Sequence, residues 1–301
     1  MYKRVLVTLD GSPLAEQALP YARLLSKGLG IPLVLFRAYN PMPDMAYPPS
    51  GAAWDRISDM MRDEAAGYLT RQAKLLRNGD VDATTAMEAG NPTDEIIQEA
   101  ERQRTTLVVM TTHGRSGVAR GILGSVATRV VNAGNIPVFL VKAKDKPASA
   151  NSITLDTILV ALDGSPLAEQ ALPHVNTLAK SLDLNVVLLN IHEQMHVEVD
   201  FIGRSKSPNE KSFREYEAKA AEYLEKLATK VKGQGVTKVE QRIEHGQPAD
   251  VFADIARDLP NSFIAITTHG RSGLGRWIMG SVADRVVREA NVPVLMTRVK
   301  K

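Results

Sequence analysis

The sequence predicts an α/β protein made of two tandem domains, each with a doubly wound sheet of five parallel strands. The chain has 301 residues, about twice the length of an average domain. Its halves repeat one another: LVTLDGSPLAEQALP at 6–20 returns with one difference at 159–173. TTHGRSG also occurs twice, at 111–117 and 267–273. Within each half, short apolar runs alternate with amphipathic segments, as in parallel strands joined by helices.

A polar linker separates the repeats. Residues 142–154 read KAKDKPASANSIT and are rich in Lys, Ala and Ser, with one proline. We therefore place the domain boundary inside this segment, with domains at 1–147 and 148–301.

The first strand and the turn after it are predicted from KRVLVTLDGSP at 3–13. The β-branched apolar run is typical of a strand. Ser12 can cap the free N–H groups of the helix that follows, and Pro13 suits the first helical position because it has no N–H to lose. Pro20 lies inside the same helical pattern, so we expect that helix to kink or end early.

The remaining elements of the first half alternate in the same way. We expect strands at 31–39, 83–90, 105–112 and 137–143, and helices from about 52 to 76, at 92–103 and at 124–134. The second half repeats this order, with a long charged helix at 215–232. A nearly continuous apolar character of the strands indicates a sheet covered by helices on both faces, with ligands binding at the carboxyl ends of its strands.

Composition excludes several classes of function. Lys and Arg total 37 and Asp and Glu total 34, so the chain lacks the clustered charge of a nucleic-acid binder or a polybasic membrane anchor. The absence of cysteine excludes disulfides, zinc–thiolate sites and a cysteine nucleophile. The first apolar run is too short for a signal peptide, and no stretch approaches the roughly 20 apolar residues of a membrane helix. We expect a cytoplasmic protein with neither nucleic acid nor membrane as partner.

A glycine-containing loop is the main candidate site. Gly114 is followed after nine residues by Gly124-Ser125, and the second half repeats this spacing from Gly270 to Gly280-Ser281. Glycines allow close approach of a ligand to the backbone, and a serine at a helix start adds a hydroxyl beside free N–H groups, which suits phosphate. Nearby arginines could neutralise further charge: Arg115, Arg120, Arg271 and Arg276. The alternative is a strand–loop–helix connection with nothing bound.

Two aspartates and two histidines accompany these loops. Asp10 and Asp163 follow the first strand of each half, where a carboxylate can accept from ribose hydroxyls or hold Mg²⁺, or can start an Asx-turn. His113 and His269 lack a Ser–His–Asp spacing, so we expect them to shape the loop.

These motifs together resemble the universal stress protein family, over essentially the whole chain. ATP-binding members of that family carry Gly-x-x-Gly, nine residues, then Gly-Ser or Gly-Thr. Thr111 stands here at the first glycine position, and Thr267 departs in the same way. The start VTLDGS, a Gly-x-Pro in each half and the final runs PVFLV and PVLMT also resemble this family.

The resemblance implies an adenine nucleotide alpha hydrolase-like fold with strand order 3-2-1-4-5 in each half. It also implies that the two fifth strands, Val138–Val141 and Val294–Thr297, pair within one chain as a pseudo-dimer, since each would otherwise be an open apolar edge. A further homodimer remains open.

The resemblance also implies the binding residues: adenine against the ends of the first and second strands, ribose and Mg²⁺ at the aspartate, and phosphates at the glycine loop. The first-half residues are Thr8, Leu9, Asp10, Ala38, Met110, Thr111, Gly114, Arg115, Gly124, Ser125 and Val126. Those of the second half are Ala161, Leu162, Asp163, Ile191, Ile266, Thr267, Gly270, Arg271, Gly280, Ser281 and Val282. Met110 and Ile266 end the fourth strands, where an apolar residue more often belongs to the core than to a ligand wall.

We therefore interpret the protein as a stress-response protein that binds ATP in one or both domains and acts as a nucleotide-dependent switch or signalling module, with slow hydrolysis or none. The equal motifs of the two halves lead us to expect two ATP per chain. The alternative is a nucleotide-free scaffold or chaperone-like interaction protein. A related adenylating enzyme is disfavoured, because such enzymes carry Ser-Gly-Gly-x-Asp-Ser after the first strand and this chain has Asp-Gly-Ser-Pro.

Overall fold

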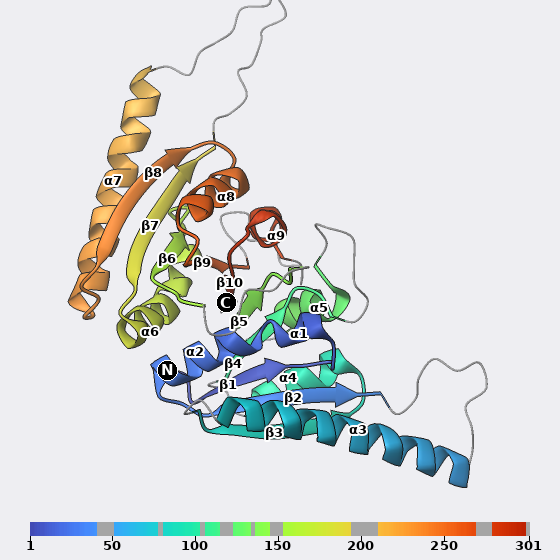
Figure 1. Ribbon diagram of the computed structural model, residues 1–301. Helices are drawn as coiled ribbons and strands as arrows, with labels where there is room; N and C mark the ends of the chain where they lie inside the picture. Colours follow the sequence, from blue (N-terminus) through green and yellow to red (C-terminus); the bar gives the residue numbers. More distant parts are fainter. Residues whose placement is uncertain are drawn as a thin grey trace, which may run out of the picture. The chain divides into compact units, whose positions relative to one another are not determined.

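The fold consists of two units, seen here in a computed structural model (Figure 1). The structure describes residues 1–40, 51–77, 81–102, 106–114, 123–133, 136–144, 153–193, 210–268 and 279–298. The first unit contains residues 1–154 together with 293–300, and the second contains 155–292. The predicted domain boundary after residue 147 lies outside the described residues and stays a prediction.

The first unit contains a sheet whose five parallel strands have the predicted order. The order is β3-β2-β1-β4-β5. The strands are β1 (Arg4–Thr8), β2 (Leu33–Tyr39), β3 (Ala83–Ala89), β4 (Thr106–Thr111) and β5 (Val138–Val141). Every residue of β1, β4 and β5 is buried, which explains the unbroken apolar runs in the sequence. The predicted doubly wound α/β fold is confirmed, with the strand order 3-2-1-4-5 in this half.

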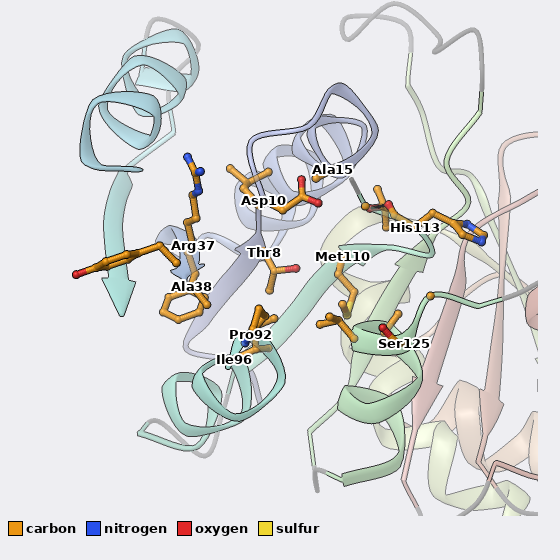
Figure 2. A pocket seen from close by; sticks show the side chains of 18 of the residues that line it. Thr8, Asp10, Ala15, Arg37, Ala38, Pro92, Ile96, Met110, His113 and Ser125 are labelled. Atoms are coloured by element: carbon orange, nitrogen blue, oxygen red, sulfur yellow. Dashed lines mark hydrogen bonds between the residues drawn. The ribbon is translucent and has the colours of Figure 1, made fainter. Parts of the chain in front are cut away.

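Helices lie on both sides of this sheet (Figure 2). They are α1 (Pro13–Glu16), α2 (Leu19–Leu29), α3 (Ala52–Arg77), α4 (Pro92–Arg102) and α5 (Ser125–Ala133). Ser12 caps α1, because its Oγ accepts a hydrogen bond of 3.2 Å from the backbone N–H of Ala15. The expected interruption at Pro20 is confirmed: α1 ends at Glu16, and Pro20 lies in the first turn of α2.

The edge of the first sheet is closed by a strand from the end of the chain. Strand β10 (Val294–Thr297) belongs to the first unit and pairs antiparallel with β5. Leu295 lies opposite Phe139, and both side chains are fully buried. The predicted pairing of the two final strands is therefore confirmed, and β5 does not present an open apolar edge.

The second unit repeats the same alternation of strands and helices. Its parallel strands have the order β8-β7-β6-β9 and are β6 (Thr157–Ala161), β7 (Asn185–His192), β8 (Val239–His245) and β9 (Ser262–Thr267). Its helical elements are η1 (Ala168–Ala171), α6 (Leu172–Leu182), α7 (Glu210–Gly233), α8 (Pro248–Asp258) and α9 (Ser281–Glu289). Among the described residues of the two units, none of the helices combines the length and apolar character needed to cross a bilayer.

Candidate functional site

A cavity of about 440 Å³ opens at the carboxyl ends of β1, β2 and β4 in the first unit (Figure 2). Such a volume lies within the range of roughly 300–1,000 Å³ that is usual for small-molecule sites. The cavity brings together ten of the residues named from the sequence: Thr8, Leu9, Asp10, Ala38, Met110, Thr111, Gly114, Gly124, Ser125 and Val126. Arg115 lies outside the described residues. The position at the strand ends is the one that a doubly wound sheet predicts.

Two glycines allow the backbone around this cavity to pack closely. The N–H of Gly124 donates a hydrogen bond of 2.8 Å to the carbonyl of Thr112, and a Cβ at Gly124 would lie 2.9 Å from that oxygen. A Cβ at Gly114 would lie 2.2 Å from Oδ2 of Asp10. A side chain at position 124 would therefore displace backbone, so the loop requires glycine there for steric reasons, whereas a side chain at position 114 would require only that the Asp10 carboxylate move.

Helix α5 begins at Ser125, directly behind the second glycine. The first N–H groups of a helix have no partner within it, and the helix dipole makes this end positive. Ser125 and Val126 both line the cavity, so the hydroxyl and the helix N-terminus lie at its wall. This geometry suits an anionic group such as phosphate.

Asp10 forms the Asx-turn that was the alternative interpretation and still faces the cavity. Its Oδ1 accepts a hydrogen bond of 2.9 Å from the N–H of Ser12. Its Oδ2 lies against Gly114, as the position of the hypothetical Cβ shows. Figure 2 shows the carboxylate above Thr8 at the edge of the site. Turn formation and ligand contact are therefore compatible roles for this residue.

Thr111, which stands at the first glycine position of the family motif, stabilises the loop. Its hydroxyl donates a hydrogen bond of 2.6 Å to the carbonyl of His113. Among the described residues, the only one other than glycine with a positive φ is Asp183, so Thr111 keeps ordinary strand geometry. The Oγ1 of Thr112 lies 3.0 Å from Nδ1 of His113. These bonds fit the expectation that His113 shapes the loop.

The wall on the β2 side contains residues that the sequence did not single out. Arg37 is buried and forms two hydrogen bonds with Glu64 of α3, Nη1 to Oε1 at 3.1 Å and Nη2 to Oε2 at 2.7 Å. Its guanidinium lies 5.2 Å from the ring centroid of Tyr68. Burial is the main cause that raises the pKa of the Tyr68 phenol above its usual range, and the negative charge of the nearby Glu16 raises this pKa further. The available signal was one arginine inside the apolar strand LVLFRAY.

The opposite wall, near the start of α4, is apolar. Pro92 and Ile96 face the cavity below Ala38 (Figure 2). Met110 lies between this wall and Ser125 and is itself buried. The cavity therefore has an apolar wall at the start of α4, beside Ala38 and Met110, and a polar end beside the glycine loop.

The second unit places the corresponding residues at corresponding strand ends. Ala161 ends β6, Thr267 ends β9 and Ser281 begins α9. Asp163 repeats the Asx-turn through a bond of 2.9 Å from the N–H of Ser165. The N–H of Gly280 repeats the bond of 2.8 Å to a threonine carbonyl, that of Thr268. The other described members are Leu162, Ile191, Ile266 and Val282, while Gly270, Arg271 and His269 lie outside the described residues.

Comparison with known families agrees with the fold. The model of the universal stress protein family matches residues 1–142 and again residues 154–298. The chain belongs to the universal stress protein family. Its two Usp domains follow one another in tandem across the chain.

Several known universal stress proteins are similar to this chain. One from Methanocaldococcus jannaschii is 31% identical over 146 residues, which are 48% of this chain and 85% of that protein. One from Mycobacterium tuberculosis is 27% identical over 307 residues, covering 98% of this chain and 96% of that protein. The crystal structure of a universal stress protein from Archaeoglobus fulgidus has the same fold, with a TM-score of 0.71, 22% identity and 99% coverage of both chains.

Proposed function

We propose that the protein binds ATP in the cavity of the first unit and acts in the stress response as a nucleotide-dependent switch. The observation that carries this proposal is that one cavity combines an apolar wall at the start of α4 with a polar end at the glycine loop and the N-terminus of α5. A nucleotide has the same combination, with a flat base at one end and a charged phosphate chain at the other. The chain belongs to the universal stress protein family, and the resemblance of its loop motifs to the ATP-binding members of that family supports this assignment.

The base would lie at the apolar wall. Ala38 and Ile96 offer the apolar surfaces there, and Thr8 and Leu9 also line the cavity. Apolar contacts with a few well-placed polar groups are what small-molecule sites use to bind and orient a ring.

The phosphates would lie at the glycine loop. Gly114 and Gly124 leave room for close approach, and Ser125 offers its hydroxyl at the start of α5. Asp10 is the residue that would hold Mg²⁺, because this ion is usually bound by one or two carboxylates together with substrate phosphates. When bound, Mg²⁺ would neutralise part of the phosphate charge. We assign no catalytic residue, and the function does not require hydrolysis.

The decisive experiment is analysis of small molecules released from the purified, denatured protein, followed by thermal unfolding of nucleotide-stripped protein with ATP and Mg²⁺. We expect ATP in the released material and a higher Tm in its presence, because a ligand that binds only the native state stabilises it. CTP at the same concentration is the matched control. Neither release nor stabilisation would favour the nucleotide-free scaffold.

A further inference from the structure

The two repeats differ at the gap between the carboxyl ends of their first and second strands. In the first unit the last register pair of these strands is Thr8 with Phe36, and in the second it is Ala161 with Leu189. One further backbone bond follows in each unit: the N–H of Leu9 donates to Phe36 at 2.8 Å, and the N–H of Leu162 donates to Leu189 at 3.0 Å. The backbones are therefore equivalent up to this point.

Beyond this point, a side chain fills the gap in the second unit. Nδ2 of Asn190 donates a hydrogen bond of 2.8 Å to the carbonyl of Leu162, across the ends of β6 and β7. Asn190 is only 3% exposed. Its amide therefore occupies the space between these two strand ends.

A tyrosine from α7 holds this amide in place. The hydroxyl of Tyr216 donates a hydrogen bond of 2.5 Å to Oδ1 of Asn190. The Tyr216 ring packs on His192, with 3.9 Å between the ring centroids, and His192 lies opposite His245 on the neighbouring strand. The chain of contacts from Leu162 through Asn190 to Tyr216, here called the Asn190 bridge, thus ties β6 and β7 to α7.

The residue equivalent to Asn190 in the first unit is Arg37, because each directly follows the last register pair. The Arg37 side chain extends away from Ala38 (Figure 2). Its guanidinium is bonded to Glu64 on α3. The gap beside Leu9 is part of the cavity, which both Leu9 and Arg37 line.

We propose that the Asn190 bridge occupies in the second unit the place that the nucleotide base takes in the first, so that the chain binds one adenine nucleotide. This inference rests on the proposed function. A base entering the second unit must displace the Asn190 amide from one buried and one partly buried hydrogen bond, which weakens binding there by on the order of 10- to 100-fold. The equal glycine motifs predict two nucleotides per chain instead, and the experiment below decides between these stoichiometries.

The test is equilibrium dialysis of the full nucleotide-stripped chain with ATP and Mg²⁺. We expect one ATP per wild-type chain and none for Gly124→Val, which blocks the first site. Asn190→Ala combined with Tyr216→Phe removes the bridge without leaving an unpaired hydroxyl, and we expect two ATP per chain. Asn185→Ala is the control. It removes a side-chain amide of β7 that bonds to the exposed Glu240 and not to Leu162, so we expect this variant still to bind one ATP per chain.

The remaining outcomes separate this inference from the proposed function. Two ATP per wild-type chain would overturn the inference and leave the proposed function standing, whereas none would overturn both. One ATP per chain that persists in Gly124→Val would mean that the occupied site does not depend on the Gly124 loop, and it would overturn the inference. The inference would also be overturned if the double variant Asn190→Ala/Tyr216→Phe bound only one ATP per chain. Circular dichroism and the unfolding transition, matching those of the wild type, would show that this variant is folded.

Discussion

Gly124 and Thr112 are joined by a backbone hydrogen bond of 2.8 Å that closes the glycine loop onto the end of β4. A Cβ at Gly124 would approach the Thr112 carbonyl to 2.9 Å, a distance that real Cβ atoms seldom show. The loop can therefore form this hydrogen bond only because position 124 has no side chain.

The first prediction is that Gly124→Val abolishes ATP binding at the first unit and leaves the fold intact. The valine side chain would move the loop off the Thr112 carbonyl and cover the start of α5. We expect a stability loss of about 1–2 kcal/mol, measured by urea unfolding, and loss of ATP binding by calorimetric titration. Unchanged affinity would mean that the phosphates lie elsewhere.

Gly67→Ala is the matched control for that variant. Gly67 lies inside α3, and its nearest neighbour is the flexible end of the Arg71 side chain at 3.4 Å. Replacement by alanine in a helix interior should increase stability by about 0.5–1 kcal/mol, with ATP binding unchanged.

The second prediction concerns the ion pair beside the cavity. Glu64→Gln removes the charge that neutralises a buried guanidinium, since the Arg37 side chain is 5% exposed and that of Glu64 is 58% exposed. We expect the free energy of unfolding, measured with urea, to fall by about 1 kcal/mol. The loss is small because solvent already screens the exposed Glu64 carboxylate. Glu222→Gln breaks the fully exposed pair with Lys226 and should produce no measurable change. Equal effects of the two variants would contradict this reasoning.

The third prediction is a loss of stability at alkaline pH that depends on Tyr68. Burial raises the pKa of this phenol in the folded state, whereas an unfolded tyrosine ionises near pH 10. Below that pH both states are protonated and the folded state keeps its full stability. As the pH rises past it, only the unfolded state loses the proton, so stability falls. Tyr68→Phe should therefore lose less stability than the wild type between pH 8 and pH 11, as measured by urea unfolding.

The fourth prediction concerns the sheet edge. Removing residues 293–301 deletes β10 and uncovers β5, whose four residues are all buried in the intact chain. An uncovered apolar strand pairs readily with another chain. We expect dimers or larger assemblies of this shortened chain by light scattering after gel filtration. A chain shortened only by residues 299–301 keeps β10 and is the control; equal masses for both would exclude β5 as the associating edge.

The fold could be predicted from the sequence because the duplication and the strand–helix alternation are local signals. Apolar runs such as RVLVT and TLVVMT correspond to β1 and β4, whose residues are all buried. The division of the first helix at Pro20 followed from proline chemistry alone. The pairing of β5 with β10 is a long-range contact, and it was available only through the resemblance to the universal stress protein family.

The candidate site was predicted in part. The glycine loop and Asp10 have recognisable spacing, so the sequence indicated the residues at the polar end of the cavity. Arg37 and Asn190 were missed because their roles depend on partners in distant helices, Glu64 of α3 and Tyr216 of α7. Equal motifs in two repeats do not reveal such differences between the surrounding walls.

The position of β10 also affects the order in which the protein can fold during synthesis. Strand β5 ends at Val141, but the strand that covers it begins only at Val294. At about 5–20 residues per second, a ribosome needs roughly eight to thirty seconds to translate the stretch between them. During that interval the first sheet has an uncovered edge on a polysome, beside other nascent chains with the same edge. We infer that β5 of a nascent chain is open to pairing with another chain until the last strand emerges.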